Sequence, residues 1–370
     1  MTLWKTVFLF LLINGFGLPS WSQSRLQFHS NALLRYENQE FPDSPPGRES
    51  VDRYRIRWRP ELLFQIHPDA QIGIEAEANW INESDDDVRP PRFPEFHTPA
   101  FDRDNFKRDA VVLSKAFVRY LPSQKFFIVA GKFDNPFLTS ELLWDDDLRA
   151  NGAALSASYE SPAGSNSLTL RAADFYASHY LHDRTNVLAV QGIFQATTGA
   201  ARWTFASTYY DHNVDELGTS LVRTNTRSGA TVLNDYNLLD MIARIRINLL
   251  LPLRVQVDYV VNTAKETFIP TLAGNGDQGL LAEFFVGNIE KPHGFRLGYA
   301  YHRVESDAVF AAYNTDDWWF PTRGEGYRLR GSFKPIEHMI LSLSYLKQTL
   351  IGQEAEFKRL QVSAEIDWPE

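Results

Sequence analysis

Cysteine is absent from all 370 residues, so the fold must be stable without disulfide bonds and no lipid can be attached through a cysteine. After residue 22, no apolar run approaches the roughly 18 residues of a membrane-spanning helix. The motifs GxSxG and HExxH and any glycine-rich phosphate-binding loop are also missing. These absences exclude transmembrane helices in the exported chain and leave no motif that would indicate an enzyme.

Acidic residues outnumber basic ones. Asp and Glu total 46, Lys and Arg total 37, and the formal net charge is −9, which argues against nucleic acid as a partner. Aromatic residues nonetheless make up 14% of the chain, and they are dispersed among polar residues. Dispersed apolar residues are typical of a transmembrane β-barrel, in which alternate side chains of each strand face lipid.

The first 22 residues have the pattern of a signal peptide. Lys5 supplies the positive charge, residues 7–18 form the apolar stretch, and Ser20 and Ser22 are the small residues that a signal peptidase recognises. We therefore expect cleavage after Ser22 and export of residues 23–370. No linker divides that mature chain, so we expect a single domain.

The mature chain shows strand-like alternation or β-rich composition almost throughout. Short turns, such as 67–69 and 198–199, alternate strictly with mostly long connections, such as 83–108 and 212–236. This alternation predicts an all-β fold: a transmembrane, up-and-down, antiparallel β-barrel with periplasmic turns, longer external loops and both termini in the periplasm. The 16 predicted strands are 25–36, 51–66, 70–82, 109–121, 124–133, 151–160, 165–175, 187–197, 200–211, 237–249, 253–263, 278–289, 293–304, 324–334, 338–349 and 356–368.

Arginines occupy one face of several predicted strands. In the strand 51–66 they alternate with Tyr54, Ile56 and Trp58. An arginine on the lipid face costs about 2–4 kcal/mol at the bilayer midplane, so the arginine faces should point into the lumen. The alternative is the solvent face of a soluble sheet. The basic residues expected to line the pore are Arg53, Arg55, Arg57, Arg59, Lys115, Arg119, Arg244 and Arg246.

The connection 134–150 combines apolar side chains with concentrated acid. Its apolar residues include Phe137, Leu142 and Leu143, and three consecutive aspartates follow them. We expect this connection to fold back into the barrel with its apolar side against the wall. The alternative is a surface loop containing a one-turn amphipathic helix. The expected constriction residues are Glu141, Trp144, Asp145, Asp146 and Asp147.

The stretches GKFDNPF at 131–137 and LLWDDDLRANG at 142–152 resemble the putative porin family of bacterial outer-membrane proteins. The resemblance implies an outer-membrane channel with general-porin-like architecture. In such porins the third external loop folds inward and its acids face a basic wall, and 134–150 is the third long connection here. Porins of this kind are usually trimers. Their last residue is usually aromatic, whereas here Trp368 is followed by Pro369 and Glu370.

Three polar clusters could in principle bind a metal ion. His179, His182 and Asp183 are loosely spaced, and the acidic runs 85–87 and 145–147 lack the spacing of a calcium-binding loop. Surface histidines and solvated or lumenal charges are the simpler interpretation. We therefore expect no metal ion and no cofactor.

The sequence thus predicts a porin, not an enzyme, through which small hydrophilic solutes or ions diffuse passively along an arginine-lined, water-filled lumen. A substrate-selective channel for acidic metabolites or sugars is one alternative, and a soluble secreted glycan-binding β-protein is another. We expect a modest preference for anions, to which Arg55 and Arg57 contribute most. The expected partners are outer-membrane lipid, the barrel assembly machinery, small solutes and, in a homotrimer, further copies of the chain.

Overall fold

A computed structural model describes residues 25–41, 50–83, 110–176, 186–213, 224–228, 231–264, 276–315, 317–353 and 355–368. Within these ranges no helix is long and apolar enough to cross a membrane. The predicted signal peptide, the acidic run 85–87 and the cluster of His179, His182 and Asp183 lie outside the described residues, as do Pro369 and Glu370.

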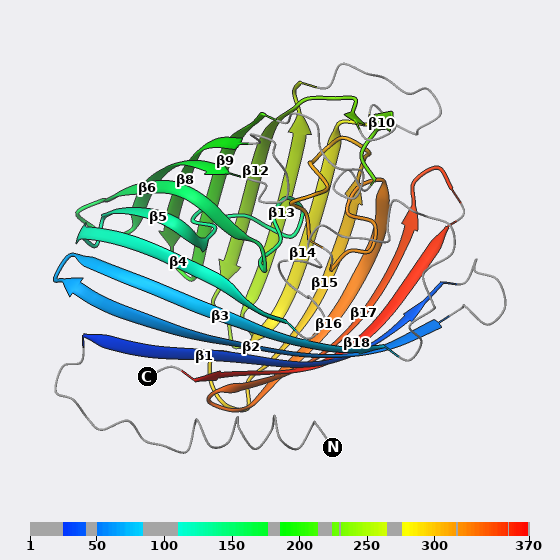
Figure 1. The fold of residues 1–370 in the computed structure, drawn as a ribbon, viewed down its shortest axis with the longest axis horizontal. Coiled ribbons are helices and arrows are strands. Elements are labelled where there is room, and N and C mark those ends of the chain that lie inside the picture. The colour runs from blue at the N-terminus through cyan, green and yellow to red at the C-terminus, as the bar shows by residue number, and fades with distance from the viewer. Residues whose placement is uncertain are drawn as a thin grey trace.

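Antiparallel strands close into one barrel (Figure 1). The order around the barrel follows the chain, and β1 pairs with β18 to complete the ring. The barrel strands are β1 (Leu26–Glu40), β2 (Ser50–His67), β3 (Ala70–Glu83), β4 (Ala110–Ser123), β5 (Phe126–Asp134), β6 (Arg149–Glu160), β7 (Asn166–Tyr176), β8 (Asn186–Thr198), β9 (Ala201–Asn213), β12 (Tyr236–Ile247), β13 (Leu253–Asn262), β14 (Gln278–Asn288), β15 (Phe295–Val304), β16 (Gly324–Ile336), β17 (Met339–Leu350) and β18 (Glu356–Trp368).

Closure of the ring removes the free strand edges that would otherwise expose backbone hydrogen-bonding groups to lipid. The closing pair runs from Ser30 opposite Trp368 to Glu40 opposite Lys358, and in Figure 1 the blue strand β1 lies beside the red strand β18. Each predicted strand corresponds to one of these barrel strands, so the predicted up-and-down, 16-stranded antiparallel β-barrel is confirmed.

One small element was not predicted. The connection between β9 and β12 contains a two-stranded hairpin formed by β10 (Arg227–Ser228) and β11 (Thr231–Val232), separate from the barrel. Two-residue strands are too short to produce a period-two pattern in a sequence, so alternation could not reveal them.

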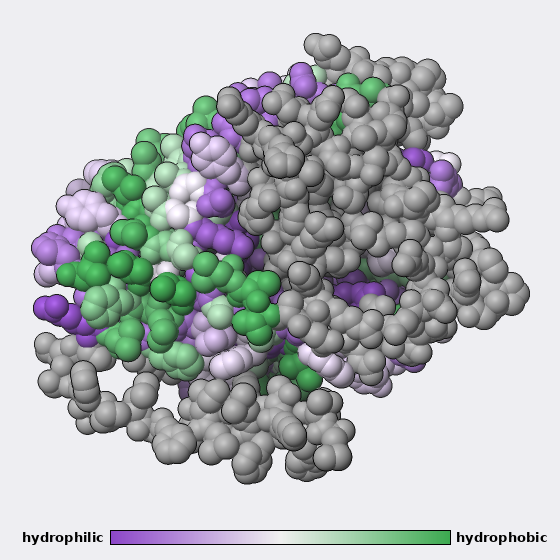
Figure 2. Space-filling model, in the orientation of Figure 1, coloured by the Kyte–Doolittle hydropathy of each residue, from purple (hydrophilic) through white to green (hydrophobic). Residues whose placement is uncertain are grey.

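The outer face of the barrel is apolar. Along β9, Trp203, Phe205 and Tyr209 are exposed, whereas the intervening Thr204 and Thr208 are buried. Figure 2 shows hydrophobic side chains gathered over much of the visible barrel wall. A face of exposed aromatic and aliphatic side chains is stable against lipid and costly in water, so this surface is that of a membrane-spanning barrel.

Strict alternation is interrupted on the wall between β3 and β4. The register between β3 and β4 shifts between Glu75 and Ala76, where Glu75 pairs with Lys115 and Ala76 pairs with Leu113. The extra residue, Ser114, and its neighbour Lys115 are both buried. A β-bulge of this kind places consecutive side chains on one side of a sheet, and here it adds an ammonium group to the interior.

Candidate functional site

Residues 135–148, which connect β5 to β6 and are called here the β5–β6 segment, contact strands all around the barrel. Asp147 bonds Arg57 on β2, Leu138 bonds Gln191 on β8, and Ser140 bonds Asp258 on β13. Glu141 bonds Arg328 on β16. A single segment can reach strands so far apart on a closed ring only through its interior. We infer that the β5–β6 segment crosses the lumen.

Apolar side chains fix this segment to the inner wall. Phe137 packs edge-on against Phe175 and Tyr210, with ring centroids 5.8 Å apart in each case. Leu142 is fully buried and lies over Gly279, where an added Cβ would approach Leu142 Cδ1 to 3.2 Å. The wall therefore leaves space for this side chain, and burial of leucine and phenylalanine stabilises the segment by about 1.5–3 kcal/mol each.

Two polar side chains of the wall bind the segment as well. The amide of Gln191 accepts from the backbone N–H of Leu138 and donates to its carbonyl, both at 2.8 Å. The Ser140 hydroxyl bonds the Asp258 carboxyl group and accepts from the backbone N–H of Leu142 at 3.1 Å. These bonds satisfy backbone groups that would otherwise be buried without partners.

The acids of the segment meet wall arginines. Both carboxylate oxygens of Asp147 lie 2.6 Å from Arg57 Nη1, and Oδ1 lies 2.9 Å from Arg59 Nη1. Glu141 accepts from Arg328 Nη2 at 2.6 Å and lies 3.9 Å from Arg330. Asp145 is turned toward the chain itself, where it accepts from the backbone N–H of Asp147 at 2.7 Å.

The pKa values of two neighbouring aspartates of the segment are shifted in opposite directions. Burial alone would raise the pKa of Asp147, but the positive charges of Arg57 and Arg59 outweigh it and lower that pKa. Asp146 is exposed toward the cavity and has no such pairing with any residue that the structure describes; partial burial, together with the negative charges of Glu141 and Asp147, raises its pKa to about 6. The charge of the Asp146 carboxyl group therefore changes near pH 6.

A second connection also enters the site. Residues 305–323, which join β15 to β16 and are called here the β15–β16 segment, contact the β5–β6 segment directly. Trp144 stacks on Tyr313 with centroids 5.5 Å apart, and Trp318 Nε1 donates to Glu141 at 3.1 Å. Asp317 lies 3.7 Å from Arg35 and 3.9 Å from Arg359 on the wall.

The β15–β16 segment is held by a buried carboxylate. Asp307 accepts from the Tyr236 hydroxyl at 2.9 Å, from the Asn234 amide at 3.0 Å and from the backbone N–H of Thr226 at 2.9 Å. Asn225 also donates to the carbonyls of Ser306 and Val309, both at 2.8 Å. The connection between β9 and β12 thus fixes the β15–β16 segment in place.

Sequence reasoning missed this second segment as part of the site. Its signal was present: the apolar runs AVFAAY at 308–313 and WWF at 318–320 lie within one long connection, and nearly all of these side chains are buried. Buried aromatic residues in a long loop indicate that the loop packs on the fold instead of extending into solvent.

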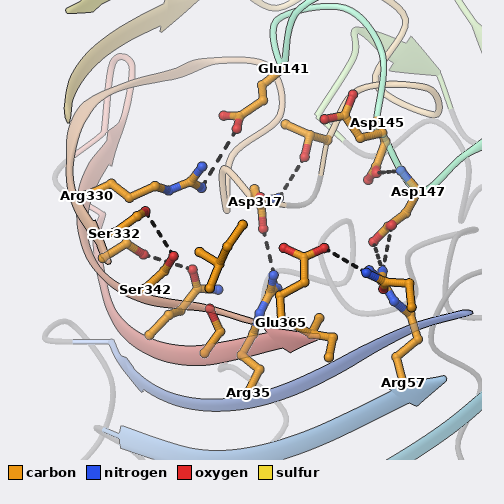
Figure 3. Close-up of a pocket in the computed structure, with 18 of the residues that line it drawn as sticks. Arg35, Arg57, Glu141, Asp145, Asp147, Asp317, Arg330, Ser332, Ser342 and Glu365 are labelled. Carbon is orange, nitrogen blue, oxygen red and sulfur yellow. Dashed lines mark hydrogen bonds and ion pairs between the residues drawn. The ribbon is translucent and has the colours of Figure 1, made fainter. Parts of the chain in front are cut away.

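A cavity of about 490 Å³ lies between the two segments and the wall formed by β1, β2 and β15–β18. Acids of both segments face arginines of the wall across it: Figure 3 shows Glu141 directed toward Arg330, Asp317 toward Arg35, and Asp147 toward Arg57. The charged residues of its lining are Arg35, Arg57, Arg59, Glu75, Glu141, Asp145, Asp146, Asp147, Arg149, Arg296, Asp317, Arg330 and Glu365.

The predicted basic residues do not form one cluster. Of that set, Arg57 and Arg59 line the cavity. Arg53 and Arg55 lie 4.0 Å and 3.6 Å from Glu37.

The other predicted basic residues are distributed around the barrel. Lys115 pairs with Glu61, Glu75 and Asp134 at 3.1, 3.0 and 2.9 Å. Arg119 lies over the Phe117 ring at 5.0 Å, Arg244 donates to Gln256 at 2.6 Å, and Arg246 pairs with Glu290. Four arginines that were not predicted as site residues also meet the acids of the two inner segments, as Arg57 and Arg59 do: Arg35, Arg328, Arg330 and Arg359.

Known proteins resemble this chain in part of its sequence and in its fold. The family model described as putative porin matches residues 97–209, so the resemblance read from residues 131–152 is confirmed. A search of the curated proteins finds no match.

Solved structures of similar fold come from Gram-negative bacteria. A high-pH structure of Pseudomonas putida OprB has a TM-score of 0.62 at 11% identity, over 99% of this chain and 97% of that chain. OmpT, an outer membrane protein of Vibrio cholerae with loop L8 deleted, has a TM-score of 0.51 at 10% identity, over 93% and 100%. Pseudomonas aeruginosa OpdQ has a TM-score of 0.50 at 8% identity, over 93% and 99%.

The porin family match and the closed barrel with its apolar outer face place this protein in the bacterial outer membrane.

Proposed function

We propose that this protein lets small hydrophilic solutes and ions diffuse passively through a water-filled lumen that is narrowed by the β5–β6 and β15–β16 segments. The observation that supports the proposal is the cavity of about 490 Å³ between these segments and the arginine wall. Its lining is mostly charged or hydroxylated, which suits hydrated solutes and offers little to apolar ones.

The arrangement of charge determines how the narrow part of the lumen acts on solutes. Acids on the inner segments face arginines on the wall, so a solute in the cavity experiences a field across the pore. Such a field orients solutes that carry a dipole. Because the two signs are paired at 2.6 Å for Asp147 with Arg57 and for Glu141 with Arg328, much of each charge is neutralised locally.

Selectivity between anions and cations should accordingly be modest. Seven carboxyl groups and six guanidinium groups line the cavity. Protonation of Asp146, whose pKa is about 6, makes the number of charged carboxylates equal to the number of guanidinium groups. We propose a slight preference for anions, because arginines continue along the wall beyond the cavity at Arg244 and Arg254, where ion pairs are absent among the described residues.

Two measurements test the proposal together. The purified protein should migrate faster unheated than boiled on a denaturing gel, as a closed barrel does, and should produce stepwise conductance in planar bilayers bathed in potassium chloride. A protein that fractionates with the outer membrane but gives no conductance would refute the channel; a protein recovered from the soluble periplasm would refute the membrane location and favour the glycan-binding alternative.

A further inference from the structure

We propose that the wall of this channel carries a binding subsite for small hydroxylated organic anions, of the sugar-acid class, formed by two transverse rows of side chains on β13–β18. The inference rests on the proposed channel function and specifies which solutes the lumen favours.

The register of the sheet defines the two rows. In the first row, pairing across neighbouring strands aligns Arg254, Phe285, Gly298 and Arg330, and it continues to Ser344 and Gln361. In the second row, pairing aligns Arg296, Ser332, Ser342 and Ser363. The rows are two residues apart along each strand, which is about 7 Å, so both lie on the same face.

The arginine end of the rows is arranged around one aromatic ring. Arg254 lies over the Phe285 ring at 4.1 Å, and Arg296 approaches the same ring at 5.4 Å. The ring itself covers Gly298, where an added Cβ would come within 2.5 Å of Phe285 Cε1. Glycine at this position therefore lets one buried aromatic ring hold two guanidinium groups, through cation–π attraction.

These two guanidinium groups form no close ion pair within the described part of the chain, although the Glu283 carboxyl group acts on both at longer range. Among the described residues, neither Arg254 nor Arg296 lies within 4.0 Å of a carboxylate, in contrast to Arg57, Arg59 and Arg328. Arginine forks bind carboxylate and phosphate through two parallel bonds, so an oxyanion complements this end of the rows.

The other end of the rows carries hydroxyl and amide groups. Ser332 and Ser342 lie 3.0 Å apart, and Ser344 donates to Gln361 at 3.1 Å. A hydroxyl has one donor and two acceptor sites, so these pairs leave sites free toward the lumen. All four side chains, and Arg296 and Arg330, line the cavity. A solute with an acidic group and several hydroxyl groups fits where the arginines adjoin the hydroxyl groups, with Arg296 opposite Ser332 and Arg330 opposite Ser344.

The experiment is block of potassium chloride current in planar bilayers by gluconate, with propionate as a carboxylate that lacks hydroxyl groups. Gluconate should reduce the current of the wild type at lower concentration than propionate. Arg254→Gln/Arg296→Gln should weaken block by both anions, by about tenfold for each guanidinium group removed. Ser332→Ala/Ser344→Ala should weaken block by gluconate alone.

Matched controls separate the possible outcomes. Arg202→Gln removes an arginine of the wall that donates to Gln195, outside the rows, and should leave block unchanged. Phe285→Leu keeps both charges but removes the ring, so it should weaken block even if the double arginine variant fails to assemble. Equal block by gluconate and propionate, or equal loss in Arg202→Gln and the double variant, would overturn the subsite. Absence of any potassium chloride current would instead overturn the channel itself.

Discussion

Asp147 on the β5–β6 segment presents both carboxylate oxygens to Arg57 Nη1 on β2, each at 2.6 Å. The bond joins residues 90 positions apart and places an acid of the inner segment against the arginine face that the sequence predicted. In the proposed channel, an ion near Arg57 therefore experiences the negative charge of Asp147 as well as the positive charge of Arg57.

Substitutions of this pair should therefore have opposite and compensating effects on ion selectivity. Asp147→Asn removes a negative charge beside Arg57 and should shift the zero-current potential toward anions. Arg57→Ser removes a positive charge beside Asp147, which keeps its pair with Arg59, and should shift the potential toward cations. A unit charge about 7 Å from an ion in water contributes ~0.6 kcal/mol, so each permeability ratio should change by about threefold before screening. The double variant should return close to the wild type.

Arg55 is also paired with an acid, since it lies 3.6 Å from Glu37, and its removal should likewise affect ion selectivity. Arg55→Ser/Arg57→Ser should shift the zero-current potential toward cations in a salt gradient, as the sequence predicted. A wild type that is cation-selective, or a double variant with no shift, would show that these arginines do not govern selectivity.

Asp146 should make the channel sensitive to pH. Its pKa is raised from 3.8 to about 6, so the carboxyl group is charged above that pH and becomes neutral as pH falls through 6. The neighbouring Asp147 and Asp317 have lowered pKa values and stay charged. Reducing the pH from 7.5 to 5 should therefore move selectivity toward anions, by about the threefold of one unit charge.

Asp146→Asn is the control for this titration. The variant should show the low-pH selectivity of the wild type at every pH. If the variant and the wild type respond alike, another group is responsible for the titration.

The β15–β16 segment can be tested through Trp318, which is fully buried, stacks on His302 with centroids 4.4 Å apart, and donates to Glu141. Trp318→Ala should lower the free energy of unfolding by about 3–5 kcal/mol and increase conductance, because the side chain supports the acid opposite Arg328. Trp203→Ala, on the lipid face, should leave conductance unchanged. Equal conductance in all three proteins would mean that the β15–β16 segment does not border the pore.

The predicted signal peptide has its own test. We expect the mature chain to begin at Gln23, since Ser20 and Ser22 flank Trp21 after the apolar stretch. Intact mass measurement of protein purified from outer membranes should show loss of residues 1–22. Retention of those residues would contradict the expected route of export.

The barrel could be predicted from the strict alternation of short and mostly long connections together with period-two patterns, because lipid outside and water inside impose opposite requirements on alternate residues of every strand. The arginines of β2 illustrate this, because the free-energy cost of placing arginine against lipid was enough to assign their face to the lumen. The same pattern could not show that Arg55 meets Glu37 while Arg57 meets Asp147, because partners on other elements depend on register and on where the inner segments lie.

The β15–β16 segment was missed for a related reason. A loop has no periodicity, so its position follows from packing, such as the stack of Trp144 on Tyr313 and the bonds to Asp307. Composition could have indicated burial of the run 308–313, but not its contact with the β5–β6 segment. The subsite at Arg254 and Arg296 likewise depends on Phe285 and Gly298 being register neighbours, which no single strand reveals.

The most direct test of this account is the single-channel conductance of a variant from which residues 139–147 of the β5–β6 segment are deleted. The variant should first show the faster migration of an unheated barrel, which establishes that it has assembled. We expect its conductance in planar bilayers to exceed that of the wild type, because the deletion removes Glu141, Trp144 and the three aspartates from the lumen. Conductance equal to that of the wild type would contradict the account and place the segment outside the path of ions.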